Sequence, residues 1–349
     1  MTNLAECVDK LNGAGETERC YAAEDIGYLN AAAGVPPLLK RIGREPSSAV
    51  REAIFQALIR IDSEAAIEAA VGLFESDDPQ IRNQAVVVLR RKGTQAVPFL
   101  AAAMRSGDKD IRKLVLDVLS GMRMVEAGEI YAAALDDPDP NVVITAVENL
   151  GRMRAMDYRG RVEELLLRET HPMLTAACIE ALVELGQPAS LAAIRGRSGA
   201  LAAAPDFLLS SYLKAIAALG TADDLAEVAQ LLATRGAHLR PAILGALLTL
   251  HSRGPTPEPP ANLIPALQAV ANGDDPPLCR YQAVLMLGAW AARDAVYRFL
   301  LGCLSSRERL VRLAAVEAIR IAQRPEWRPL LAQHGRTEAD EEILQALNG

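Results

Sequence analysis

Aliphatic and polar residues follow one repeated pattern along the chain, Val/Ile-Arg-x-x-Ala-x-x-Ala/Val-Leu, which returns about every 31 residues. We call the Arg position of each copy its anchor. The ten anchors are Arg19, Arg51, Arg82, Arg112, Val143, Thr175, Leu209, Arg240, Arg280 and Arg312. Seven positions later every copy carries an aliphatic residue: Ile26, Leu58, Leu89, Leu119, Leu150, Leu182, Ile216, Leu247, Leu287 and Ile319. This self-similarity predicts a solenoid, in which each unit buries its apolar face only by stacking on its neighbours.

Each unit reads as a pair of helices. In segment 80–93, apolar residues recur at helical spacing and Gly93 is a plausible stop. Pro98 then falls in the first turn of a second helix, where proline is tolerated. The turns between units read Asp-Asp-Pro, as at 77–79, 136–138 and 274–276, and we expect an Asp there to cap the following helix. The pattern therefore predicts an all-α chain of about ten helical pairs, forming a single array over residues 1–349.

Two segments break the period. The interval from Arg240 to Arg280 is 40 residues long and holds a Pro-rich stretch over 251–262, which we interpret as a loop insertion. It is either a plain surface loop or a docking segment for a partner. In segment 187–206, Gly196 and Gly199 interrupt the helical pattern, which predicts a flexible joint or a local change of curvature.

The repeated motif resembles HEAT repeats, and more narrowly the bacterial type named for phycobilisome lyases. The resemblance lies in segments such as DDPQIRNQAVVVL, DDPDPNVVITAVENL and DDPPLCRYQAVLML. It implies a right-handed α-α superhelix. It also implies a ladder of hydrogen bonds between turn Asp and helix Arg, which would make Asp78–Arg82 and Asp108–Arg112 structural. Such repeats serve unrelated roles, so the resemblance indicates fold more than function.

Composition narrows the possible partners. The formal net charge of −7 and the pI near 5.3 argue against a surface that neutralises phosphates, so we expect no nucleic-acid partner. No run of 18 apolar residues and no basic-apolar leader is present, so we expect no membrane association and a cytoplasmic location. The five cysteines lack C-x-x-C spacing, and we interpret them as buried reduced thiols.

No motif for catalysis, a metal or a cofactor is present. None of the four histidines lies three or four residues from another, and none precedes Glu, which excludes the His-Glu metal sites of some HEAT-repeat enzymes. The chain has neither a G-x-x-x-x-G-K-S/T loop nor a G-x-S-x-G elbow. We therefore predict no catalytic residues, no bound metal and no cofactor.

A candidate partner-binding face lies five positions after the anchors, on the side of each helix opposite the core. If the second helix of each pair lines the concave face, these positions form a mixed-charge stripe there, which is either a plain solvated surface or a groove for a partner. The acidic members are Glu24, Asp117, Glu148, Glu180 and Glu317, accompanied by Arg152 and Arg320. Tyr281 and Trp290 add aromatic side chains of the kind that dominate binding interfaces, and Trp327 is a further rare aromatic.

Two classes of function follow. The first is a non-catalytic scaffold that binds another protein on the concave face. The second, implied by the resemblance, is a subunit of a bilin lyase or isomerase or a chaperone-like tetrapyrrole-binding protein. Under that alternative the candidate pocket residues are Tyr281, Trp290, His251 and Cys279.

Overall fold

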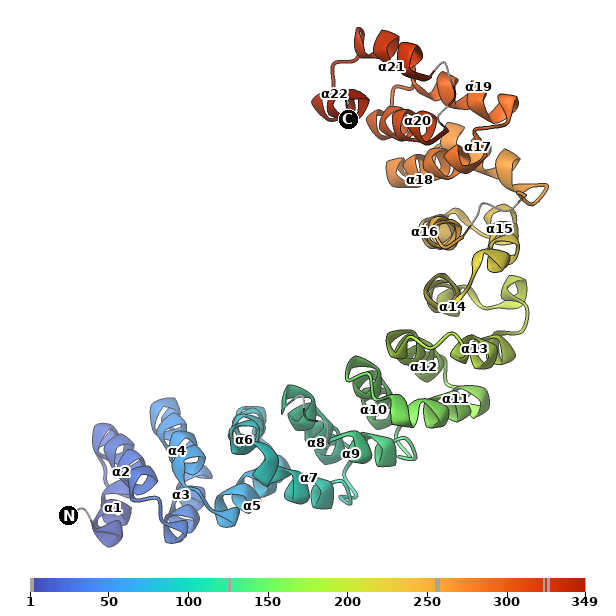
Figure 1. Cartoon of the computed structure of the whole chain (residues 1–349). Helices are drawn as coiled ribbons and strands as arrows, with labels where there is room; N and C mark the ends of the chain where they lie inside the picture. Colours follow the sequence, from blue (N-terminus) through green and yellow to red (C-terminus); the bar gives the residue numbers. More distant parts are fainter. Residues whose placement is uncertain are drawn as a thin grey trace. The chain divides into compact units, whose positions relative to one another are not determined.

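Every regular element in the described part of the chain is a helix, as the computed structural model in Figure 1 shows. The structure describes residues 3–122, 124, 127–254, 258–322, 324 and 327–348, and no β-strand occurs among them. Residue contacts group the chain into two compact units, Met1–Arg161 and Val162–Gly349, with the boundary inside α11 (Arg159–Arg168). The continuity of the array across this boundary stays a prediction.

In the described residues of the first unit, ten α-helices precede α11. They are α1 (Leu4–Leu11), α2 (Glu16–Leu29), α3 (Val35–Ile42), α4 (Ser48–Arg60), α5 (Glu64–Gly72), α6 (Pro79–Lys92), α7 (Val97–Ala103), α8 (Lys109–Met122), α9 (Ala127–Ala134) and α10 (Pro140–Arg152). Short 3-10 turns join several of them: η1 (Ala32–Gly34), η2 (Leu73–Glu75), η3 (Gly93–Ala96) and η4 (Met156–Tyr158).

The second unit continues the same alternation. Its α-helices are α12 (Pro172–Leu185), α13 (Ser190–Ser198), α14 (Asp206–Leu219), α15 (Leu225–Thr234), α16 (Arg240–His251), α17 (Leu263–Asn272), α18 (Pro277–Leu287), α19 (Asp294–Cys303), α20 (Arg309–Ala322), α21 (Trp327–Gly335) and α22 (Glu341–Asn348). Its 3-10 turns are η5 (Leu201–Ala203), η6 (Ala222–Asp224), η7 (Ala237–Leu239) and η8 (Gly288–Trp290).

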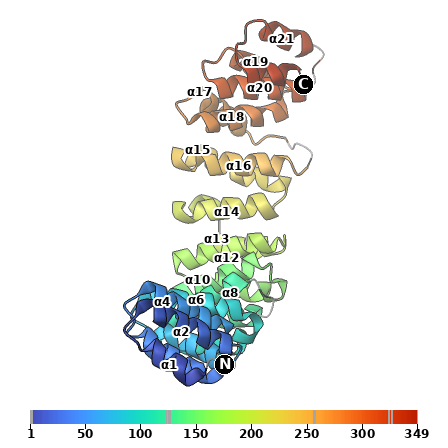
Figure 2. The same cartoon turned by 90° about the vertical axis from the view of Figure 1, so that its left-hand side faces the viewer.

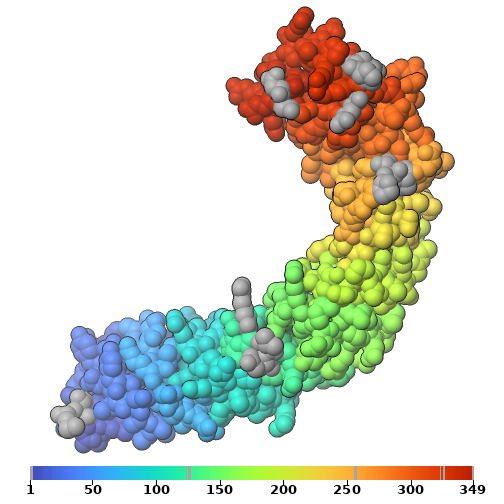
Figure 3. Space-filling model, viewed as in Figure 1, coloured from blue at the N-terminus to red at the C-terminus, as the bar shows by residue number. Residues whose placement is uncertain are grey.

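Within each unit the helices form two layers. The anchored helices α2, α4, α6, α8 and α10 pack in order as one row of the first unit, while α3, α5 and α7 pack as a second row (Figure 1). In the second unit α12, α14, α16, α18 and α20 repeat the first row and lie side by side (Figure 2). Side chains fill the spaces that the ribbons leave between neighbouring helices (Figure 3). The predicted all-α solenoid is confirmed.

The anchor register explains the core between the layers. All ten aliphatic residues seven positions after an anchor are buried, and none exposes more than 1% of its surface. Burying one Leu or Ile side chain stabilises a fold by about 1.5–3 kcal/mol. Because a helical pair offers its apolar side chains to both neighbours, this core exists only where units stack.

Most of the anchor arginines join their helical pair to the next one, but the residues that pair differ from those that the family resemblance implied. In five of the seven anchor arginines the guanidinium reaches the acidic residue in the turn of the next helical pair, whereas Arg82 and Arg280 donate to backbone carbonyls. The pairs, with their closest N–O distances, are Arg19–Glu45 (2.9 Å), Arg51–Asp78 (2.9 Å), Arg112–Asp137 (2.6 Å), Arg312–Glu338 (2.8 Å) and Arg240–Asp275. The expected pairs Asp78–Arg82 and Asp108–Arg112 are therefore wrong.

Turn acids and anchor arginines in the same unit do not meet because both have other partners. The Asp78 carboxylate caps its own helix by accepting from the backbone N–H of Gln80, at 2.8 Å. Asp108 accepts in the same way from Asp110, also at 2.8 Å. Arg82 instead donates to the carbonyl of Ser76 in its own turn, at 2.6 Å. The aspartates act as the caps that the turn sequence predicted.

In each compact unit a glycine eight residues after its anchor allows two neighbouring helices to pack closely. A Cβ atom built on Gly27 in α2 would lie 2.8 Å from the Cα of Ala57 in α4. Gly288, also eight positions after its anchor, would place a Cβ 2.9 Å from the Cβ of Ala318 in α20. Only a residue without a side chain fits between such backbones.

The two predicted irregularities have different outcomes. In segment 187–206, α13 runs through Gly196 and ends at Ser198, and Gly199 has a φ of 61°. Gly199 is thus a stop in the left-handed region, whereas Gly196 does not interrupt the helix. Residues 255–257 of the predicted Pro-rich loop lie outside the described residues. The segment lies between α16 and α17, and its role as an insertion stays a prediction.

We predict that Gly27→Ala lowers stability by about 1–3 kcal/mol, because α2 must move away from α4 to accommodate the methyl group. Gly245→Ala is the matched control. Gly245 lies inside α16 with no atom near the built Cβ, so alanine there should raise stability by about 0.5–1 kcal/mol through its helix propensity. Urea unfolding followed by circular dichroism measures both. Equal effects of the two substitutions would contradict the close-packing account.

We predict that the Arg19–Glu45 pair makes stability depend on pH in the acid range. Burial alone would raise the Glu45 pKa, but hydrogen bonds from Arg19, the Ser47 N–H and Arg41 hold it at about 2. A depressed pKa contributes stability above the ordinary value and loses it as pH falls towards 2. The free energy of unfolding should therefore fall by about 3 kcal/mol between neutral pH and a pH below 2.

The measurement is the melting temperature of the wild type and of Glu45→Gln between pH 6 and pH 2. The wild type should melt higher at pH 6, and the gap should narrow as the Glu45 carboxylate of the wild type takes up a proton. Glu68→Gln, at an exposed position on α5, should follow the wild type throughout. A gap that stays constant over this range would rule out the proposed linkage.

Candidate functional site

The predicted acidic residues of the first unit lie on the anchored helices and have different surroundings. Glu24 is half-buried on α2. Burial raises the pKa of Asp117 on α8, while the charges of Lys113 and Arg90 lower it. Glu148 is exposed on α10, where its carboxylate lies 3.0 Å from Arg152 one turn later. An exposed pair of this kind contributes little to stability, so these charges are available to a partner.

The predicted residues of the second unit include two that already have internal partners. Glu180 is exposed near Lys214, at 4.0 Å. The Tyr281 hydroxyl donates to Glu317 at 2.7 Å. Burial, followed by this hydrogen bond and the Glu317 charge, raises the Tyr281 pKa to about 12. Tyr281 and Glu317 therefore bind each other across α18 and α20.

Trp290 is not a surface residue. Its side chain is 5% exposed, and its ring lies 6.2 Å from that of His251, centroid to centroid. Trp290 belongs to the short η8 turn, which packs against α20, and its ring lies near that of His251 at the end of α16. The prediction that Trp290 faces a partner is wrong: the side chain follows an apolar helix and is buried by packing inside the protein.

Two tyrosines on α2 were not among the binding residues predicted from the sequence. Tyr21 and Tyr28 are 63% and 69% exposed, the two most exposed aromatic residues in the described part of the chain. With Glu24 they are spaced by three and four residues, which places all three on one helix face. The Arg60 guanidinium on α4 lies over the Tyr28 ring, 4.5 Å from its centroid. Inspection of positions two and nine after the anchor would have revealed them.

The same face continues over the next two helices. Gln56 on α4 and Val87 on α6 occupy the register position of Glu24, and Arg91 occupies that of Tyr28. All three are exposed, Val87 to 41%. Since α2, α4 and α6 pack in order, these residues form a continuous surface. We call the set Tyr21, Glu24, Tyr28, Gln56, Arg60, Val87 and Arg91 the tyrosine face.

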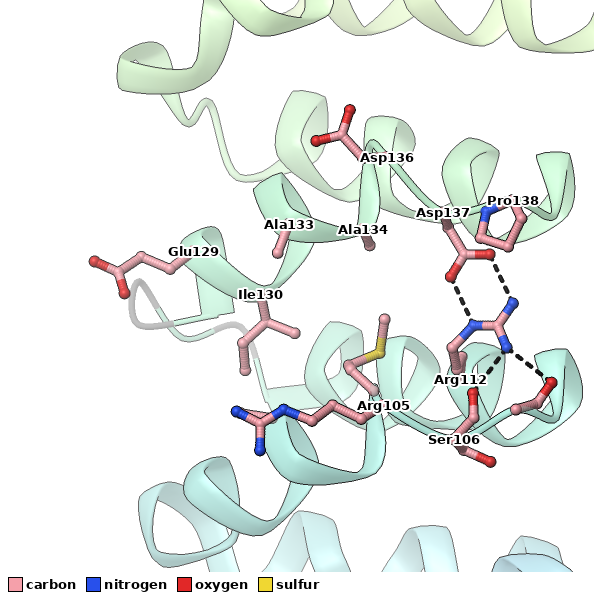
Figure 4. Close-up of a pocket in the computed structure, with 13 residues that line it drawn as sticks. Arg105, Ser106, Arg112, Glu129, Ile130, Ala133, Ala134, Asp136, Asp137 and Pro138 are labelled. Atoms are coloured by element: carbon pink, nitrogen blue, oxygen red, sulfur yellow. Dashed lines mark hydrogen bonds and ion pairs between the residues drawn. The ribbon is translucent and has the colours of Figure 1, made fainter.

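A cavity of about 750 Å³ lies in the other layer, between the α7 end and α9 (Figure 4). Ile130 points into it from α9, beside Ala133 and Ala134. Arg105 and Glu129 extend towards one end, and neither has an ion-pair partner among the described residues.

The Arg112–Asp137 pair closes the opposite end of this cavity. Arg112 donates through two nitrogens to the two carboxylate oxygens of Asp137, at 2.6 and 2.7 Å, and also to the carbonyl of Ser106 at 2.9 Å. Both side chains are buried. The hydrogen bonds that Arg112 donates to Asp137, and the charges of neighbouring aspartates, raise the Arg112 pKa. The ion pair thus forms a fixed polar side of the cavity, and the apolar space beside it has the size of a ligand pocket.

The cysteines are held as thiols. Cys7, Cys178, Cys279 and Cys303 are buried and Cys20 is half-buried, and all five are free. Burial raises the pKa of Cys178 to about 12 and that of Cys303 to about 11. Burial also raises the pKa of Cys279. A thiol in this state is a poor nucleophile and a poor metal ligand.

Two further findings concern metals and membranes. Over the described ranges, no group of three or more His, Cys, Asp or Glu residues is arranged to hold a metal ion. In the same part of the chain, no helix has both the length and the apolar character needed to span a bilayer.

Comparisons with known proteins agree with the fold. A family model described as HEAT repeats matches residues 5–90 and 129–200. A crystal structure of an engineered protein covers 93% of this chain and 100% of its own, with a TM-score of 0.50 and 17% sequence identity. At this identity the likeness concerns the fold alone. No curated protein matches the chain.

We predict that the anchor arginines differ in their contribution to stability. Arg112→Ala should cost about 3 kcal/mol, because it leaves the buried Asp137 carboxylate without its partner. Arg82→Ala should cost about 1 kcal/mol, since Arg82 donates only to a backbone carbonyl. Urea unfolding measures both variants against the wild type. A larger loss for Arg82→Ala would show that the ladder does not distribute stability in this way.

Proposed function

We propose that this protein is a non-catalytic interaction scaffold, and that the tyrosine face of its first unit binds a partner protein. One observation carries the proposal: Tyr21 and Tyr28 expose most of their surface on the same face of one helix. The chain contains only seven tyrosines, so this placement concentrates a scarce residue type. Tyr and Arg are enriched among the residues that dominate binding energy.

The surroundings of Tyr28 support a binding role. Stacking under Arg60 holds the ring in one orientation while it remains 69% exposed. An ordered aromatic side chain loses less conformational entropy when a partner covers it. Val87 extends the apolar part of the surface onto α6, and Glu24 and Arg91 place charges of both signs beside it. Such charges orient a partner and speed its association more than they raise affinity.

Location and partner class belong to the same proposal. Five free thiols suit the reducing cytoplasm, where disulfides are rare. A net charge of −7 disfavours nucleic acid as the partner. The bilin-lyase alternative and the phycobilisome-lyase repeat type have no supporting observation. Of the pocket residues they would use, Cys279 and Trp290 are buried and Tyr281 is bonded to Glu317.

The test is affinity capture from the source cells with wild-type protein and with Tyr21→Ala/Tyr28→Ala, quantified by mass spectrometry. The captured amount of at least one protein should fall about tenfold or more with the double variant. Each aromatic side chain at the centre of an interface contributes about 1 kcal/mol or more to the binding free energy. That protein is then purified and its affinity measured by titration. Unfolding curves of the two forms should coincide, since both tyrosines lie outside the core.

Leu167→Ala provides the matched control. Leu167 is 53% exposed on α11, so the substitution removes exposed apolar surface away from the tyrosine face. It should leave the captured set unchanged. If Leu167→Ala and the double variant lose the same proteins, or neither loses any, the tyrosine face is not the binding surface. Light scattering of the purified protein separates a partner of another kind from self-association, which would also contradict the proposal.

A further inference from the structure

A second cavity, of about 620 Å³, lies among α20, α21 and α22 in the second unit. Leu331, Leu344 and Leu347 supply its apolar lining, together with Trp327. Leu331 is 2% exposed and the other three are partly exposed, so the apolar surface is open at the cavity mouth. A volume of this size is typical of a ligand pocket.

Among the residues that the structure describes, the charged residues lining this cavity are the three arginines Arg320, Arg328 and Arg336. Arg320 donates to the carbonyl of Ala346, and Arg328 stacks on the Trp327 ring, 5.2 Å from its centroid. Within the described residues none of the three has a carboxylate partner. Arg320 is one of the residues predicted from the sequence to meet a partner.

Three acidic residues near these arginines already pair with other arginines. Glu338 pairs with Arg312 at 2.8 Å. Asp340 and Glu342 both pair with Arg309. Glu341, at the start of α22, does not line the cavity, so the charged side chains that line it among the described residues are all positive. The cavity therefore combines an apolar floor with a cationic rim.

We propose that this cavity binds an acidic peptide segment that carries a bulky apolar side chain. Arg328 and Arg336 are eight residues apart along α21 and its end, which corresponds to about 12 Å of helix rise. One carboxylate cannot reach both. An extended peptide with two acids four residues apart spans about 13 Å, so it can meet both arginines while a side chain between them enters over the leucines.

The cavity occupies a different unit from the tyrosine face, so the proposal does not rest on the function proposed above. A peptide titration of α20–α22 succeeds or fails without any change to α2.

The probe is acetyl-Glu-Leu-Phe-Ser-Glu-amide, titrated into the full chain and followed by tryptophan fluorescence and calorimetry. The chain has two tryptophans, so Trp290→Phe leaves Trp327 as the only reporter. Calorimetry on the unsubstituted protein gives the affinity independently of that variant. The peptide should shift the Trp327 emission. Replacing both Glu by Lys in the peptide should abolish binding, and added salt should weaken it.

Arg328→Gln/Arg336→Gln should weaken peptide binding about tenfold, because two charge-assisted contacts are lost. Arg307→Gln is the matched control, at an exposed arginine that does not line the cavity. The proposal is overturned if the Lys peptide binds equally well, or if Arg307→Gln weakens binding as much as the double variant. Binding of sodium decanoate without binding of the peptide would also overturn it and assign the cavity to small amphipathic acids.

Discussion

The fold depends on one constraint, that a helical pair of this sequence can bury its apolar side chains only against another pair. The aliphatic residue seven positions after each anchor is buried in every unit, whatever the anchor itself has become. Val143, Thr175 and Leu209 stand at the anchor position where other repeats have arginine, yet Leu150, Leu182 and Ile216 are in the core. Apolar stacking is therefore the general interaction, and the arginine ladder is an addition to it.

The ladder strengthens only part of the chain. Although Arg82 and Arg280 donate to backbone carbonyls, the other anchor arginines pair with an acid in the next turn in two stretches, from Arg19 to Asp137 and from Arg240 to Glu338. Between them three consecutive anchors lack arginine, and the boundary between the two compact units falls in that stretch, at residues 161–162. A buried carboxylate left without its arginine is destabilising. A substitution of the anchor arginine is therefore tolerated only if the paired acid is substituted as well.

Helical class and core register could be predicted from the sequence, because each depends on local periodicity repeated ten times. The ladder pairing could not. The spacing places Asp78 equally well for Arg82 in its own helix and for Arg51 in the preceding unit, and only three-dimensional stacking selects Arg51. Trp290 was misassigned for a similar reason: an aromatic residue just beyond an apolar helix serves packing or binding according to what packs over it. The two cavities depend on how neighbouring helices pack, which the sequence period does not specify.

Surface function in a repeat array resides in departures from the repeat, since positions that all units share serve stacking. Nine positions after the anchor the chain carries Tyr28, Arg60, Arg91 and then Gly121, a variety that no common structural role requires. Gly121 has a structural reason, because Arg90 lies over it, where a Cβ would be only 2.2 Å from the guanidinium Nε. Tyr28 has no such reason: its ring is exposed and could be replaced by a polar residue without loss of core. In the function proposed above, a partner protein covers the aromatic surface that Tyr28 presents to water.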